Sequence, residues 1–222
     1  MSNIREEVNH LLKEGRYQEL VAKALESPGI LRYLFRLLYH PYGLTRWRAI
    51  EGLGCITQAL QQQNPEAVRE VIRRLLWSMN DESGTTGWSS PEAIGEIIRR
   101  NPEEYREFIS IVVNASEEEI FHRGIAWTLG RVGSLRPDLV QEFIPLLKDF
   151  LLHPRPEVRG YAARSLGQIG PTAKEALPTL QGLLKDHREI EVYQGNELAN
   201  VKLGDLAQVA IHSISGESYK PT

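Results

Sequence analysis

The sequence has a single cysteine and no apolar run long enough to cross a membrane. One thiol excludes an internal disulfide, and Cys55 has no partner ligands at the spacing of a metal site. A membrane-spanning helix needs about 18 or more consecutive apolar residues, and charged residues interrupt every apolar stretch here. Residues 1–15 are charged where a signal peptide would be apolar, so we expect a cytoplasmic protein. We also expect no metal and no cofactor.

The chain also lacks an excess of positive charge. Its 26 basic and 29 acidic residues give a net charge of −3, which excludes a whole-protein field that attracts nucleic acid. The basic residues are 19 arginines and 7 lysines, and arginine is the better partner for a carboxylate. We therefore expect a partner that is neither nucleic acid nor membrane. We also expect the protein to be a monomer.

What the chain does contain is a repeat. Segments 45–56, 87–98, 121–133 and 158–170 each carry a large aliphatic residue, a glycine, any residue and another aliphatic residue. The glycines, spaced 41, 35 and 37 residues apart, are Gly54, Gly95, Gly130 and Gly167. The preceding column is Leu53, Ile94, Leu129 and Leu166, and the following one is Ile56, Ile97, Val132 and Ile169. This spacing predicts a helix in each segment, with a small residue where a neighbour approaches closely.

A second set of helices alternates with the first. Apolar stripes run through 65–79, 102–113, 136–152 and 170–186. Each stripe begins at a proline, the residue that the first helical turn tolerates: Pro65, Pro102, Pro137 and Pro171. The repeating unit is therefore a helix, a short turn and a second helix.

These units predict one domain over residues 1–222. Residues 1–40 are expected to form N-terminal capping helices, 41–186 about four repeats, and 203–216 a C-terminal capping helix. In 187–202 the apolar residues alternate with polar ones around Gln-Gly-Asn-Glu, which fits a small β-hairpin near 189–203. A plain surface loop fits this segment equally well.

The fragment PEVRGYAARSLGQIG, residues 156–170, resembles the HEAT-like repeats of the phycobilisome-lyase type. The resemblance extends over roughly residues 40–186. It implies an all-α fold, a right-handed α-solenoid of stacked antiparallel helix pairs. Since most such proteins are binding scaffolds, it also implies a non-catalytic scaffold, adaptor or regulator whose partner is another protein or a peptide segment.

Two enzymatic alternatives share the repeat type: a HEAT-like DNA alkyl-base glycosylase and a lyase-type enzyme subunit. For the glycosylase, phosphate contacts would come from Arg73, Arg74, Arg99, Arg100 and Arg106. Glutamates interleave with these arginines, which is typical of a solvated helix face. The sequence has no catalytic motif that supports either alternative.

Residues 80–97, NDESGTTGWSSPEAIGEI, are the candidate site. Gly87 is followed by Trp88, so this is not a phosphate-binding loop of the Walker type. The Ser-Ser-Pro-Glu segment predicts a helix start, with Ser90 as N-cap or with Ser89 and Glu92 as a capping box. The preceding residues exceed the needs of a turn, and Asn80, Asp81, Glu82 and Trp88 could bind a basic partner segment.

Aligning the repeats adds two residues to this site. Trp47, Trp88 and Arg123 occupy one column, so we predict that Trp47 and Arg123 share a groove with Trp88. The alternative is that these aromatics, with Trp127, fill gaps between repeats. The preceding column holds Arg46, His122 and Arg159, which we expect to hold neighbouring repeats in register.

Overall fold

The computed structural model describes residues 2–40, 42–80 and 87–216, which are almost wholly helical. The first helices are α1 (Ser2–Glu14), α2 (Tyr17–Glu26), α3 (Gly29–Leu37), α4 (Leu44–Gln61), α5 (Pro65–Met79) and α6 (Ser90–Arg100). The later ones are α7 (Pro102–Tyr105), α8 (Glu107–Asn114), α9 (His122–Gly133), α10 (Ile144–Phe150), α11 (Pro156–Ile169), α12 (Leu177–Gly182) and α13 (Leu203–Ser215). Two strands, β1 (Glu189–Gln194) and β2 (Glu197–Lys202), precede α13.

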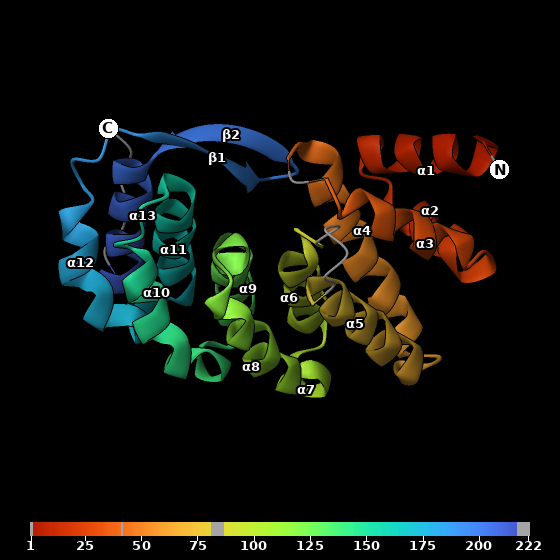
Figure 1. Cartoon of the computed structure of the whole chain (residues 1–222), viewed down its shortest axis with the longest axis horizontal. Helices are drawn as coiled ribbons and strands as arrows, with labels where there is room; N and C mark the ends of the chain where they lie inside the picture. Colours follow the sequence, from red (N-terminus) through yellow and green to blue (C-terminus); the bar gives the residue numbers. More distant parts are fainter. Residues whose placement is uncertain (1, 41, 81–86, 217–222) are drawn as a thin grey trace.

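The helices form two rows (Figure 1). Helices α4, α6, α9, α11 and α13 pack against one another in succession, and we call them the hairpin-side row. Helices α5, α7, α8, α10 and α12 form the outer row, and α1, α2 and α3 continue the array at the N-terminal end. This stacking of helix pairs confirms the predicted α-solenoid.

The repeated glycines mark places where two helix backbones nearly touch. A Cβ at Gly167 would lie 2.8 Å from Ala210 Cα, and one at Gly95 would lie 2.9 Å from Thr128 Cα. Backbone atoms cannot yield as a flexible side chain can, so these positions require glycine. The aliphatic columns on either side of the glycines are buried, as the spacing predicts.

The outer row is less regular than the sequence predicts. Segments 136–152 and 170–186 start with 3₁₀ turns, and their α-helices begin only at Ile144 and Leu177. Pro145 and Pro178 occupy the first turn of those helices, where the missing N–H has no intrahelical role. Each of these two prolines therefore marks the start of a new α-helix after the 3₁₀ turns.

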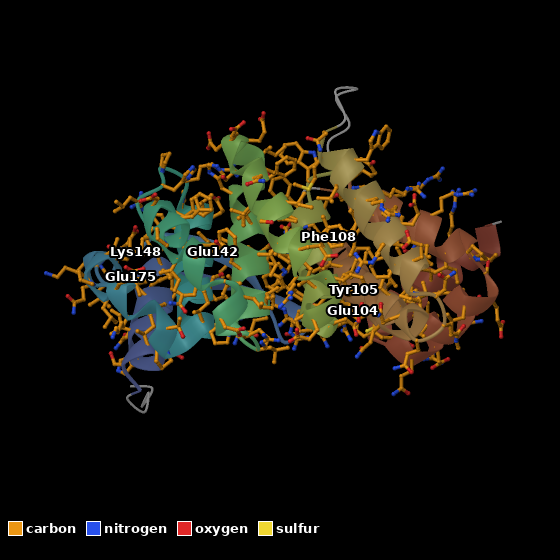
Figure 2. All side chains as sticks on the ribbon, turned by 90° about the horizontal axis from the view of Figure 1, so that it is seen from below. Glu104, Tyr105, Phe108, Glu142, Lys148 and Glu175 are labelled. Atoms are coloured by element: carbon orange, nitrogen blue, oxygen red, sulfur yellow. The ribbon has the colours of Figure 1, made fainter. Side chains whose placement is uncertain are left out.

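The outer row also divides segment 102–113 into α7 and α8. Figure 2 shows this face, where Tyr105 and Phe108 are buried against the core. On the same face, Lys148 of α10 lies 3.6 Å from Glu175 in the 3₁₀ turn that precedes α12. An exposed pair of this kind contributes little to stability.

The segment before α13 is a hairpin, which resolves the two alternatives left by the sequence. β1 and β2 are antiparallel, with Ile190 opposite Val201 and Gln194 opposite Glu197. Gly195 and Asn196 both have positive φ, the backbone of a type I′ turn, and glycine and asparagine adopt it most readily.

The hairpin lies along the hairpin-side row and reaches from α13 to α4 (Figure 1). Ile190, Val192 and Tyr193 of β1 are buried, whereas β2 is largely exposed. Tyr161 of α11 donates to the Glu191 carbonyl, and Arg164 donates to the Tyr193 carbonyl at 2.7 Å. Side chains of α11 thus satisfy the outer edge of β1.

Candidate partner-binding site

Helix α6 carries a fully buried carboxylate, Glu92, at the centre of the array. Its Oε1 lies 3.4 Å from Arg46 of α4 and 3.2 Å from Arg123 of α9. Burial lowers the pKa of Arg46, Arg123 lowers it further, and Glu92 opposes both effects. Because a buried charge needs a paired partner, Glu92 holds α4, α6 and α9 together.

One turn later on α6, Glu96 is also fully buried. Its Oε2 accepts hydrogen bonds from Arg131 at 2.8 and 3.1 Å, and Oε1 accepts one from Arg100 at 3.2 Å. Arg99 adds an ion pair at 3.6 Å. Both buried carboxylates of α6 are therefore engaged by arginines, which is a structural role.

An aromatic cluster covers the same stretch of the hairpin-side row. Trp47 of α4 lies 4.6 Å from Trp127 of α9, ring centroid to ring centroid. Tyr193 of β1 stacks on Trp47 at 5.0 Å with nearly parallel rings. The guanidinium groups of Arg131 and Arg164 lie 5.2 and 5.3 Å from the Trp127 ring. The hairpin thus seals this part of the row with its own side chain.

Trp47 is consequently 1% exposed, so the prediction that it lines an open groove is wrong. The alternative, that large aromatics fill space between repeats, is confirmed for Trp47 and its buried neighbour Trp127 but not for the exposed Trp88. Arg123 is mostly buried and is engaged by Glu92, so little of it is available to a partner.

The predicted ladder between repeats is present. Arg46 donates to Ser89 Oγ of the next unit at 2.9 Å. Arg159 donates to the carbonyls of His153 and Pro154 and lies 3.4 Å from Asp186 in the turn that follows. Hydrogen bonding from Arg188 lowers the pKa of Asp186 to about 2, so this carboxylate stays charged.

At the remaining ladder position, two histidines form one hydrogen-bonded chain. His122 Nε2 lies 2.8 Å from the Ser116 carbonyl, so it must carry a proton and donate. His122 Nδ1 then accepts from His153 Nε2 at 3.2 Å, and His153 Nδ1 accepts from the Arg155 backbone N–H at 3.1 Å. This series of hydrogen bonds requires both imidazole rings to be neutral. Burial, followed by His122 and Arg155, lowers the pKa of His153, and Glu119 opposes this shift.

The serines at the start of α6 do not form the predicted capping box. Ser89 is the N-cap residue, but its side chain makes no cap hydrogen bond, and Ser90 is already helical. Ser89 Oγ accepts from Arg46, and Ser90 Oγ lies 2.8 Å from Ser78 Oγ of α5. Buried contacts to α4 and α5 have taken the place of the cap.

Of the predicted site, Asn80 and Trp88 are exposed at the junction of α5 and α6. Asn80 Nδ2 donates to the Leu76 carbonyl at 3.1 Å, and Trp88 is 40% exposed. Backbone hydrogen bonding of Gly87 to Ser78 holds Trp88 near the end of α5. Asp81 and Glu82 lie outside the described residues.

Sequence reasoning missed a cleft beside this junction, which we call the α3–α5 cleft. It has a volume of about 240 Å³ and is lined by Arg32, Phe35, Arg36, Tyr39, Arg74, Trp77 and Ser78. Trp77 is 68% exposed, which is unusual for so large an apolar side chain. A signal was available, because residues 27–50 contain four arginines and no carboxylate.

Among the residues that the structure describes, no three His, Cys, Asp or Glu side chains gather as metal ligands. Burial raises the pKa of the half-buried Cys55, which favours the unreactive thiol. Within the same residues, no helix is both long and apolar enough to span a membrane.

Comparisons with known proteins support the repeat architecture. Residues 105–194 match the family model for HEAT repeats. An uncharacterized protein of Archaeoglobus fulgidus is 29% identical over 180 residues, which cover 78% of this chain and 91% of that protein.

Two solved structures share the fold at low sequence identity. A designed armadillo repeat protein in complex with the peptide (KR)4 has a TM-score of 0.54 and 18% identity, over 96% of this chain and 92% of its own. An engineered protein has a TM-score of 0.50 and 19% identity, over 96% of this chain and 90% of its own. The recurring glycines, the stacked helix pairs and the two similar folds show an α-solenoid of repeated helix pairs, and residues 105–194 are similar to HEAT repeats.

Proposed function

We propose that this protein is a non-catalytic scaffold that binds a segment of another protein, as a monomer in the cytoplasm. The observation that carries the proposal is the pair of exposed tryptophans, Trp77 and Trp88, at the junction of α5 and α6. Exposed aromatic side chains on a rigid framework are typical anchors of protein interfaces, because they bury much area at little entropic cost. Asn80 lies between them in sequence and can supply a polar contact at the edge.

The state of the charged residues supports a non-catalytic role. Glu92 and Glu96, the buried carboxylates of α6, each accept hydrogen bonds from arginines of neighbouring helices. The aromatic cluster above them is closed by Tyr193 of the hairpin. The buried carboxylates of α6 are thus bound by arginines of this protein, and the hairpin covers the part of the hairpin-side row around them.

A peptide segment is the partner that this architecture suits. The designed armadillo repeat protein with a similar fold was solved with a bound peptide, (KR)4. For the present chain, Asp81 and Glu82 favour a basic segment, as predicted from the sequence. The arginines that line the α3–α5 cleft instead favour a partner segment that is acidic.

The glycosylase alternative has less support from the arginines it would need. Arg73 pairs with Glu66 and Glu70, and both Arg99 and Arg100 pair with Glu96. We expect no tight binding of duplex DNA at physiological salt. Binding that weakens steeply with added salt, or release of alkylated bases, would favour the glycosylase.

The proposal is tested by capturing partners with the full chain and with Trp77→Ala, Trp88→Ala and the double variant. The matched control is Leu135→Ala with Leu152→Ala, since both leucines are exposed and lie outside the junction. We expect capture to be lost with the tryptophans and kept in the control. Melting temperatures should be close to wild type for Trp77→Ala, because its side chain is largely exposed. Identical captured proteins from wild type and the double variant would contradict the proposal.

A further inference from the structure

We propose that the α3–α5 cleft is a docking site for an acidic protein segment that carries a leucine or an aromatic residue. The inference rests on the proposed function and names the chemistry of the partner. The cleft adjoins the α5–α6 junction, since Trp77 and Ser78 line it and Ser78 contacts Gly87 and Ser90 of the junction.

The apolar part of the cleft is an anchor point. Phe35 forms its buried floor, and Tyr39 and Trp77 form its exposed walls. The guanidinium of Arg74 lies 4.5 Å from the Phe35 ring centroid, which fixes the arginine over the floor. A volume of about 240 Å³ accommodates one or two side chains of a partner and is too small for most cofactors.

The charged part of the cleft consists of arginines without carboxylates. Arg32 and Arg36 lie one turn apart on α3, and Arg74 lies across from them on α5. Among the described residues, none of these three forms an ion pair. Their neighbours on α5 differ, because Arg69 pairs with Glu107 and Arg73 lies 2.7 Å from Glu66. Of the three arginines of α5, Arg74 alone has no ion pair with a described residue, and it lines the cleft.

A second cleft continues the cationic surface on the other side of α3. It measures about 230 Å³ and contains Arg5 with Arg32 and Arg36. The guanidinium of Arg5 lies 5.9 Å from the Tyr33 ring centroid. Neither cleft is lined by an aspartate or glutamate from the described part of the chain. Four arginines thus form a track from α1 to α5 on a protein with a net charge of −3.

Carboxylates are the complement of this track. A guanidinium binds a carboxylate through two parallel hydrogen bonds, and the free rings beside it take an apolar side chain of the same segment. A nucleic acid also carries negative charge, but its backbone needs a longer array of cations than four arginines on an acidic protein. An acidic protein segment is therefore the occupant that the cleft favours.

The test uses the full chain and fluorescein-labelled peptides of about 12 residues, followed by fluorescence polarisation. One peptide repeats Glu-Glu-Leu-Phe, and its charge-reversed counterpart repeats Lys-Lys-Leu-Phe. A single-stranded oligonucleotide of similar length is the third probe. We expect the acidic peptide to bind, with weaker binding at higher salt, and the other two to bind at least about tenfold less tightly.

Variants locate the site. Arg36→Gln with Arg74→Gln should weaken binding of the acidic peptide by about tenfold or more, and Trp77→Ala should do the same. The matched control is Arg16→Gln with Arg73→Gln, two exposed arginines that already pair with glutamates. It should bind as wild type does. Melting temperatures of all variants should stay close to wild type, since every substituted side chain is largely exposed.

Several outcomes would overturn the inference. They are a failure of the acidic peptide to bind, equal or tighter binding of the basic peptide or the oligonucleotide, and unchanged binding by the Arg36→Gln, Arg74→Gln variant. The proposed function is judged separately. If that variant still captures partners and the tryptophan variant does not, the scaffold role stands and the acidic segment is rejected. If neither variant alters capture, the scaffold site itself is rejected.

Discussion

Replacing Glu92 with alanine should destabilise the whole array. Glu92 is fully buried between Arg46, which is itself buried, and Arg123. Removing one member of a buried ion pair typically costs about 3–5 kcal/mol, because the remaining charge loses its partner in a poorly solvated site. In a chain of this length each kcal/mol shifts the melting temperature by about 2–4 °C, so we expect a decrease of about 6–20 °C.

The assay is urea unfolding followed by circular dichroism, with a thermal melt as a second measurement. Glu66→Ala is the matched control, because Glu66 also pairs with an arginine, at 2.7 Å, but is exposed. Exposed pairs contribute about 0–1 kcal/mol, so this variant should unfold nearly as wild type does.

A double variant separates loss of the pair from loss of packing. Arg46→Met combined with Glu92→Leu removes both charges and keeps apolar volume, and we expect it to be more stable than Glu92→Ala. Partly exposed Arg123 can then turn to solvent. A Glu92→Ala variant as stable as Glu66→Ala would refute the reasoning that this buried carboxylate holds three helices together.

Three further predictions concern the core, the hairpin and pH. Leu166→Ala should cost about 2–5 kcal/mol, measured by urea unfolding, because its side chain fills the shared core column. Tyr193→Ala should shift tryptophan fluorescence to longer wavelength, because the ring that covers the tryptophan pair is lost; an unchanged spectrum would contradict the stacking. In the folded protein burial and His122 lower the pKa of His153, and Glu119 partly opposes them. The stability that the neutral His153 ring contributes is therefore complete above the unfolded pKa of about 6.5 and is lost as pH falls through the folded pKa. Wild type should therefore lose more stability than His153→Gln between about pH 7.5 and 5, and parallel pH profiles would contradict this.

The architecture could be predicted from the sequence because its causes are local. A glycine flanked by aliphatic residues at helical spacing reports close backbone approach, as Gly95 and Gly167 now show. The hairpin is one of the two structures that residues 187–202 allow, and Gly195 and Asn196 tolerate the positive φ of its turn. Each signal is carried by a few neighbouring residues, although Gly95 and Gly167 each meet the backbone of the next helix in the row.

The burial of the α6 carboxylates could not be predicted, because it depends on contacts with residues distant in the sequence. Glu92 and Glu96 resemble a polar helix face in the sequence, yet α4, α5, α8 and α9 surround the helix and the aromatic cluster covers it. Trp47 is buried by residues distant in sequence, Trp127 and Tyr193, the second of which lies almost 150 residues later. Repeat alignment placed Trp47 beside Trp88 in a column but carried no information about the hairpin.

The α3–α5 cleft was missed for a different reason. Residues 1–40 are expected to cap the array, so α3 lies outside the predicted site, and its polar face meets that of α5 only in the folded chain. Arg32 and Arg36 are spaced for one helix face, and the absence of carboxylates from 27–50 was visible in the sequence. That Arg74 and Trp77 face the same cleft required the packing of α3 beside α5.

We infer that partner segments bind at the α3–α5 edge and that the hairpin fills its stretch of the hairpin-side row. Hydrogen exchange of the full chain, alone and saturated with the acidic peptide, tests it most directly. We predict slower amide exchange in residues 29–39 and 72–80 and no change in 189–202. Slower exchange in 189–202 with none in α3 and α5, or no change anywhere on adding the peptide, would contradict it.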